Sequence, residues 1–456
     1  MMDRPAKLTT DVASPSTRPS TAAQDTSKPS TMAPDSRHPR WFQHASQERR
    51  QIATYAAFVG FGLASWIMTN ASYVELGVFL RELPEKYSIV AYLIFALQSA
   101  NIYPFMYMLL NAHGQRVTHS TAIWFLLVLG IIVAILMSLL WHQTTAINGH
   151  PHSVAMLVLT HLGGLVSATS TVVFYPYVAG FPSIFTSALS TGEGLSGSMA
   201  ALLGVIQRPY DGQDMLFSVE IFYVACAGIM VVSLLSFAFL ELHPWSKAAK
   251  KELDLPSTTE RSEQVPLVQP AASSLRAMLR PVWPYLLCQL ILAAFSFGTL
   301  PSIMPYVYKK YAPVDDLENA TSKYQTIANI ASLILDPVAR FLTSWVRLYR
   351  VRELTVILVL VAIGLLVASL QAHPALSSSN QGYLFPLIAH VGYLVAYAYT
   401  QTMVYFTLKR ISETTPSVLA HRVYQWSGFA TQIGAFLGTI VIFPLVFFRE
   451  DLFLRS

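Results

Sequence analysis

Charged residues and cysteines are both scarce in this sequence of 456 residues. Only 12% of the residues are Asp, Glu, Lys or Arg, and 53% are hydrophobic, whereas about 25% of the residues in a typical soluble domain are charged. The two cysteines, Cys226 and Cys288, lie inside apolar stretches, which argues against a disulfide framework. No phosphate-binding motif of the form G-x-x-x-x-G-K-S/T occurs, so we do not expect ATP to drive the protein directly. No basic stripe with interleaved aromatic residues occurs either, so nucleic acid is not an expected partner.

What the sequence does contain is eleven apolar stretches between Ile52 and Phe448, each about the length of a membrane-spanning helix. A span needs about 20 mostly apolar residues. The stretches do not alternate apolar and polar residues as the strands of a membrane barrel would. The sequence therefore predicts an all-α, multi-pass integral membrane protein. The predicted spans are residues 52–70, 88–110, 119–140, 153–177, 184–206, 217–240, 283–305, 322–345, 353–371, 382–408 and 424–448.

The distribution of Lys and Arg predicts the orientation, because short basic loops stay in the cytoplasm. With the N-terminus in the cytoplasm and the long N-terminal tail left out, the inner loops hold 13 Lys and Arg residues and the outer loops hold 8. The odd number of spans then predicts an extracellular C-terminus. This topology also puts the sequon Asn319-Ala320-Thr321 outside, so we expect a glycoprotein modified at Asn319.

Composition divides the chain into four parts. Residues 1–51, rich in Ser, Thr and Pro, predict a disordered cytoplasmic tail. Residues 52–241 predict a six-helix bundle, the polar residues 242–282 a cytoplasmic linker, and residues 283–456 a five-helix bundle. Many transporters hold their substrate between two such halves, which rock about it in alternating access.

Polar and aromatic residues recur at helical spacing on the first and fourth predicted spans of each half. We expect these four spans, with one asparagine of the second span, to line a substrate cavity. The alternatives are hydrogen bonds between helices, which are common in membranes, and, for Trp66, a belt of aromatic residues at the membrane surface. The candidates are Trp66, Asn70, Asn101, Thr171, Phe174, Thr299, Ser302, Tyr397 and Gln401.

Charged residues within predicted spans are few, and each is a functional hypothesis. Glu193 has no basic neighbour in its own span, so it is a candidate hydrogen-bond donor to substrate or proton carrier. Asp336 and Arg340 are four residues apart and can pair on one helix face. Structural pairing and a role in gating or substrate binding both stay open for them. Glu75 is expected at the outer mouth, in contact with solvent.

An ordered series of motifs resembles the eukaryotic riboflavin transporter family. The stretch from Gly62 through Trp66 and Asn70 to Leu76 is similar to the signature of its first helix. Further similar motifs follow in order at residues 140–155, 167–177, 192–196, 298–302 and 336–337. The resemblance implies an eleven-helix fold of the major-facilitator or equilibrative nucleoside transporter type. It also implies sodium-independent uptake of riboflavin across the plasma membrane.

The resemblance further implies that Trp66 and Asn70 recognise the flavin, with Asn101 as a weaker match. The chain departs from the family at four positions: Thr171 and Asp336 stand where relatives usually have Asn, Glu193 stands where they have Gln, and Gly77 replaces a proline. These departures leave substrate identity and pH dependence open.

The chemistry of riboflavin fits the candidate residues. Its flat ring system needs aromatic walls and its ribityl hydroxyls need short polar partners. Riboflavin is neutral, so no clamp of Lys or Arg is required, whereas flavin nucleotides would need one. The expected partners are riboflavin and the lipid bilayer, with no cofactor and no metal.

Three other functions are to be weighed. A transporter of nucleosides or other small aromatic solutes shares the eleven-helix plan. A membrane-embedded enzyme is disfavoured because His161 and His390 are isolated and no nucleophile constellation occurs. A receptor would bind its ligand without moving it.

Overall fold

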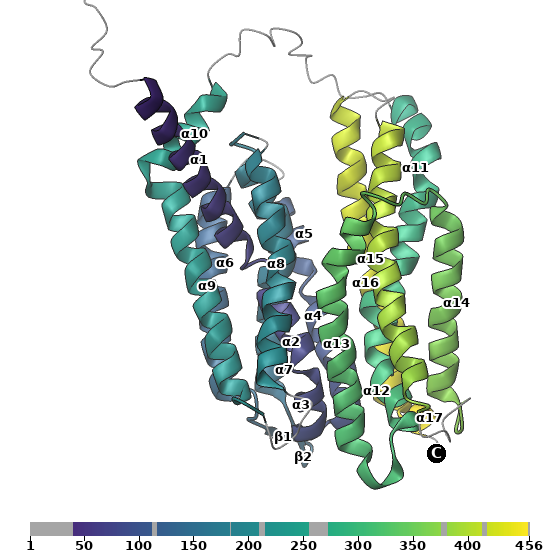
Figure 1. Cartoon of the computed structure of the whole chain (residues 1–456). Coiled ribbons are helices and arrows are strands. Elements are labelled where there is room, and N and C mark those ends of the chain that lie inside the picture. The colour runs from purple at the N-terminus through teal and green to yellow at the C-terminus, as the bar shows by residue number, and fades with distance from the viewer. Residues whose placement is uncertain are drawn as a thin grey trace, which may run out of the picture. The chain divides into compact units, whose positions relative to one another are not determined.

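The computed structural model describes residues 40–111, 116–182, 184–208, 215–254, 272–374, 381–412 and 417–454 (Figure 1). Residues 48–456 form one compact unit. In its first half the elements are α1 (Arg40–Gly62), α2 (Ile67–Val74), α3 (Leu76–Glu82), η1 (Lys86–Ser88), α4 (Ile89–Ser99), α5 (Ile102–Asn111), α6 (His119–Leu140), β1 (Thr145–Ile147), β2 (His150–His152), α7 (Val154–Val178), α8 (Ile184–Gln207), α9 (Val219–Leu242) and α10 (Pro244–Asp254).

The second half is helical throughout its described residues. Its elements are α11 (Ala272–Ala293), the π-helical turn η3 (Ala294–Thr299), α12 (Leu300–Tyr311), η4 (Val314–Asp316), α13 (Leu317–Leu342), α14 (Val351–Leu370), α15 (Leu384–Ser412), α16 (Ser417–Arg449) and α17 (Asp451–Leu454).

Helical segments cover parts of the predicted tail and linker. Residues 40–51 belong to α1, and residues 244–254 and 272–282 belong to α10 and α11. The rest of the predicted tail, residues 1–39, and residues 255–271 of the predicted linker lie outside the described residues.

Within the described residues, seven helices are long and apolar enough to cross a membrane. An eighth joins them if α1 and α2, which meet at an angle of 48°, make one span. All eight coincide with predicted spans. The other three predicted spans are α8, α13 and α15, which carry Glu193, Asp336 and Gln401 and are correspondingly more polar. The all-α membrane class is thus confirmed, while the count of eleven spans and the orientation stay predictions.

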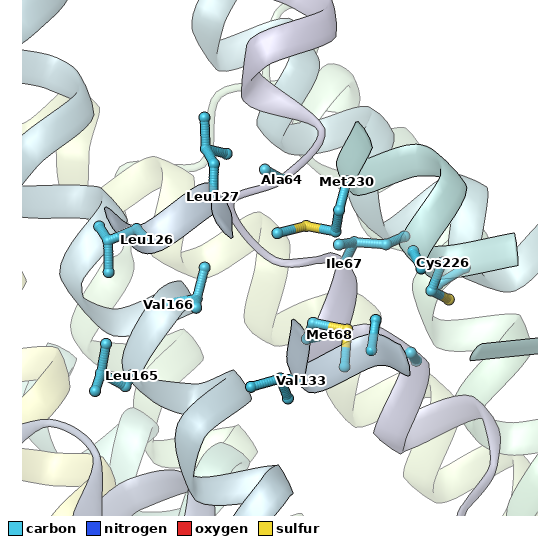
Figure 2. Packing of buried hydrophobic residues seen from close by; sticks show 14 of the residues in the cluster. Ala64, Ile67, Met68, Leu126, Leu127, Val133, Leu165, Val166, Cys226 and Met230 are labelled. Carbon is cyan, nitrogen blue, oxygen red and sulfur yellow. The ribbon is translucent and has the colours of Figure 1, made fainter. Parts of the chain in front are cut away.

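The core of the first half lies where α2 packs against α6, α7 and α9. Ile67 and Met68 of α2 lie beside Val133 of α6, and Met230 and Cys226 of α9 close the cluster (Figure 2). All five side chains are buried. Because lipid is as apolar as these side chains, close packing rather than escape from water holds such helices together.

In the second half, α16 approaches α11 and η3 through glycines. A Cβ added at Gly438 would lie 2.1 Å from the backbone oxygen of Ala294, and one at Gly434 would lie 2.1 Å from that of Leu290. Small residues of this kind let helix backbones meet closely in membranes. A second buried cluster, which includes Tyr308 and Tyr393, joins α12 to α15.

The two halves are joined along α13. Its Ser322 Oγ donates a hydrogen bond of 2.7 Å to the Gly77 backbone oxygen in α3, and its Asn329 Nδ2 donates one of 2.7 Å to the Tyr73 backbone oxygen in α2. Glu318 pairs with Lys86 at 3.2 Å. These contacts, called here the α13 closure, lie toward the end of α13 that the sequence predicts to be outermost.

Candidate functional site

Trp66 and Asn70 stand at the start of α2, just after the break that ends α1. Both side chains are half-buried. A Cβ added at Gly197 of α8 would lie 3.4 Å from Asn70 Nδ2 and 3.6 Å from Leu333 Cδ2 of α13. Asn70 therefore lies where α2 and α8 of the first half meet α13 of the second, which is the place predicted for a substrate.

Glu193 on α8 is held by a tyrosine of the neighbouring helix. The hydroxyl of Tyr175 on α7 donates a hydrogen bond of 2.5 Å to Glu193 Oε2, and the buried Oε1 has no hydrogen-bond partner. Thr171, one turn before Tyr175, donates to the Ala168 backbone oxygen at 2.9 Å. The sequence reasoning had not assigned Tyr175 a role, although its spacing of four residues from Thr171 puts both on one face of α7.

Asn101 lies at the break between α4 and α5. Its Nδ2 donates to Gln98 Oε1 at 2.9 Å, and both side chains are half-buried. His161 of α7 contacts the flanking residues, with Nδ1 2.8 Å from Ser99 Oγ and Nε2 2.9 Å from the Tyr103 hydroxyl. This histidine therefore fastens α7 to the α4–α5 break.

In the second half, Asp336, Arg340 and Gln401 form one network. Arg340 Nε lies 2.6 Å from Asp336 Oδ2, and its Nη2 donates to Asp336 Oδ1 and to Gln401 Oε1, each at 3.0 Å. The side chains of Arg340 and Asp336 are 40% and 39% exposed. The two charges neutralise each other, and the arginine links α13 to α15.

Tyr397 lies one turn before Gln401 on α15. Its side chain is buried, its hydroxyl has no hydrogen-bond partner, and the edge of its ring meets Phe297 of η3 at 5.5 Å. Tyr393, a further turn back, has its hydroxyl 3.1 Å from Ser296 Oγ. The π-helical turn η3 is therefore anchored to α15.

Three candidates have surroundings of another kind. Phe174 is fully buried against Phe61, with ring centroids 4.2 Å apart. Ser302 is fully buried and donates to the Gly298 backbone oxygen of its own helix at 2.8 Å. Thr299 lines an apolar hollow of about 430 Å³ formed with α14, α16 and α17. None of the contacts of these three includes Asn70 or the Asp336–Arg340–Gln401 network.

The predicted glycosylation site lies in the first turn of α13. Asn319 is exposed, and its Nδ2 donates to Asp316 Oδ1 at 2.8 Å. Thr321 of the sequon is fully buried and donates to the Leu317 backbone oxygen. Modification at Asn319 would therefore have to precede folding of this turn.

The site as a whole offers an indole, several amides, one carboxyl group with a free oxygen, and an internally neutralised ion pair. Helices of both halves supply these groups. In the part of the chain that the structure describes, no group of three His, Cys, Asp or Glu residues could hold a metal ion. Such a set of groups suits a flat, uncharged solute with many hydrogen-bonding atoms.

Comparison with known sequences gives a consistent result. The family model described as "Solute carrier family 52, riboflavin transporter" matches residues 50–453. The chain is 26% identical to "Solute carrier family 52, riboflavin transporter, member 3" of Homo sapiens, over 85% of this chain and 94% of that protein. The protein of the same name from Bos taurus is 25% identical with the same coverage. "Riboflavin transporter rft-1" of Caenorhabditis elegans is 24% identical over 86% of this chain and 96% of that protein.

Solved structures of similar fold are also transporters. A bacterial homologue of the human lysosomal transporter Spinster, in an inward-facing and unoccupied conformation, superposes with a TM-score of 0.53 at 15% identity, over 86% of this chain and 81% of that chain. The nucleoside transporter NupG superposes with a TM-score of 0.52 at 13% identity, over 89% and 92%. These likenesses establish the fold, which is of the major-facilitator type.

Proposed function

We propose that this chain, which belongs to solute carrier family 52, the riboflavin transporters, carries free riboflavin into the cell across the plasma membrane. The family is one of transporters and not of enzymes. The observation that carries the proposal is the position of Asn70, whose amide lies beside Gly197 of α8 and Leu333 of α13, between the two halves. The relatives, all named as riboflavin transporters, favour this solute over a nucleoside.

Riboflavin would lie with its ring system against Trp66 and with the polar edge of the ring at Asn70. Among the described residues, the Asn70 amide has no hydrogen-bond partner, so it is free to bind a ligand. Glu193 Oε1 and the Tyr397 hydroxyl would serve the ribityl hydroxyls. Arg340 is already paired with Asp336, so the site favours the neutral vitamin over flavin mononucleotide.

Transport would follow alternating access and would not require sodium. The α13 closure joins the halves near one end of α13 through Ser322 and Asn329. Breaking it would open that end while the opposite end closes, as in other two-bundle transporters.

The test is uptake of labelled riboflavin by proteoliposomes that contain the purified chain, with Trp66→Ala and Asn70→Ala beside the wild type. We expect saturable uptake that excess riboflavin or lumiflavin blocks and that both variants lose. Thr299→Val is the matched control, because Thr299 faces the apolar hollow and valine keeps its shape. Uptake blocked by adenosine alone would overturn the proposal in favour of a nucleoside transporter. Flavin binding without any flux would favour a receptor.

A further inference from the structure

A carboxylate lies buried at the joint between α2 and α3. The side chain of Glu75 is 0% exposed, and neither of its oxygens has a hydrogen-bond partner. Glu75 is not part of the site described above. An ionised carboxylate in an apolar interior without partners is so costly that the group either binds a cation or takes up a proton.

Two more unsatisfied polar side chains surround it. Gln207, the last residue of α8, is 0% exposed, and neither its amide oxygen nor its amide nitrogen has a hydrogen-bond partner. Tyr223 on α9 is 0% exposed and its hydroxyl is likewise unpartnered. Both residues are neighbours of Glu75, although no hydrogen bond joins them to it. Since buried polar groups in proteins are nearly always paired, three unpaired groups from three elements indicate a site that binds something.

The charged neighbours of Glu75 are engaged elsewhere. Glu220 on α9 accepts a hydrogen bond of 2.7 Å from Trp141 Nε1, and Arg81 on α3 pairs with Glu82 at 2.9 Å. On the remaining sides stand the Cys226 thiol of α9 and the Ser72 hydroxyl of α2, which donates to the Met68 backbone oxygen. No cationic side chain is thus paired with Glu75.

The groups present suit a proton better than a metal ion. Calcium takes six to eight oxygen ligands, including several carboxylates, whereas here one carboxylate faces one amide and one phenol. A proton on one oxygen of Glu75 would donate to Gln207 Oε1, and the other oxygen would accept from the Tyr223 hydroxyl. We propose that Glu75, Gln207 and Tyr223 form a proton-binding site that is separate from the riboflavin site.

The position of this site couples it to the α13 closure. Tyr73 and Gly77, two residues to either side of Glu75, supply the backbone oxygens that accept from Asn329 and Ser322. When the closure opens, the backbone beside Glu75 changes its partners, and water reaches the carboxylate from the opened side. A proton taken up there is sealed in when the closure re-forms and leaves to water at the other side, while riboflavin crosses chemically unchanged. This step rests on the proposed function, since it links the proton to riboflavin transport.

Infrared spectroscopy tests the site without any need for transport. Purified wild-type chain in lipid nanodiscs should show the carbonyl stretch of a protonated carboxylic acid at neutral pH, with the expected shift in heavy water. Glu75→Gln should lose this component. Glu193→Gln, which removes the other buried carboxyl group, is the matched control and should keep it. If Glu75→Gln does not fold, Tyr223→Phe should shift the band, because it removes the donor to the carbonyl oxygen. A band unchanged in Glu75→Gln, or unchanged in Tyr223→Phe, would overturn the proposal.

Proteoliposomes test the coupling. With an inward proton gradient, wild type should accumulate riboflavin above equilibrium. Glu75→Gln should lose this accumulation and keep the exchange of internal for external riboflavin. Accumulation that persists in Glu75→Gln, or that a sodium gradient drives in wild type and Glu75→Gln abolishes, would contradict a proton site. A wild type that moves no riboflavin at all would instead refute the proposed function, and the infrared result would still stand.

Discussion

The amide of Asn329 on α13 donates a hydrogen bond of 2.7 Å to the backbone oxygen of Tyr73 on α2, so a side chain of one half is bound to the backbone of the other. Such a bond is insensitive to the identity of residue 73, because any residue there offers the same oxygen. The partner that can be removed is the asparagine.

Asn329→Ala is therefore expected to favour opening of the α13 closure. Loss of one hydrogen bond destabilises the closed state by about 1 kcal/mol, or roughly fivefold in the equilibrium. The measurement is the alkylation rate of a cysteine introduced at Ile330, which is buried beside Gly204 of α8. Ser332→Ala is the control, because Ser332 donates only within α13, to Ala328. Equal alkylation rates in the two variants would show that the bond does not hold the closure.

Gly77→Ala should disturb the same closure by crowding. A Cβ at this position would lie 2.0 Å from Thr326 Oγ1 and 2.7 Å from the Ser322 backbone oxygen. Backbone cannot yield as a flexible side chain does, and overpacking of this kind costs about 1–3 kcal/mol. We expect slower riboflavin uptake. Gly194→Ala on α8, where a Cβ would meet nothing within 4 Å, should transport like wild type; a similar loss in both would point to a general effect on helix propensity.

Asp336→Asn should broaden the solutes that the transporter accepts. The change frees Arg340, which remains beside Gln401, to attract an anion. For charges about 40% exposed, the gain is about 1 kcal/mol or less. Inhibition of riboflavin uptake by flavin mononucleotide should thus strengthen up to about fivefold, whereas Asp336→Glu keeps the pairing charge. No change in inhibition would place Arg340 outside the path of the solute.

Glu193→Gln should flatten the dependence of the riboflavin KM on pH. The carboxyl group accepts one hydrogen bond from Tyr175 and has a free, buried oxygen, whereas glutamine keeps the shape and cannot titrate. Tyr175→Phe should raise KM, because an unpaired buried acceptor costs about 1–3 kcal/mol, and Glu193→Gln in the same chain should recover part of the loss. An unaltered KM profile in Glu193→Gln would remove this residue from recognition.

Glu450, between α16 and α17, predicts a pH dependence of stability. Burial raises the pKa of this carboxyl group, although the Tyr306 hydroxyl, which donates at 2.9 Å, opposes the shift. The folded chain then binds the proton more tightly than the unfolded chain does. The stabilisation is full below the ordinary glutamate pKa of 4.5 and is lost as pH rises through the folded pKa. Thermal unfolding of wild type relative to Glu450→Gln should show this decline with pH; a constant difference would contradict it.

The sequence predicted well those features that depend on neighbours along the chain. The spacing of Trp66 and Asn70 placed both on one helix, and the spacing of Asp336 and Arg340 predicted an ion pair that the structure contains. The series of motifs predicted the family, which the family model confirms. Apolar length predicted eight of the spans directly, because hydropathy is a local property.

Features that depend on packing between distant segments could not be predicted in this way. Glu75 was expected to contact solvent, yet it is fully buried, because α8 and α9 bring Gln207 and Tyr223 over it. Phe174 has the spacing of a cavity residue, but it packs against Phe61. Helical periodicity says which residues share a face and does not say which neighbour covers that face.

Helix α13 carries Ser322, Asn329 and Asp336 at intervals of seven residues. Seven residues are close to two full turns, so the three side chains follow one another along a single face. The first two grip the opposite half, and the third belongs to the ion pair beside Gln401. The helix can thus act as a lever, in which a small roll about its own axis would release both grips and swing the ion pair together. Opening at one end would then be felt at the other within the length of one rigid rod.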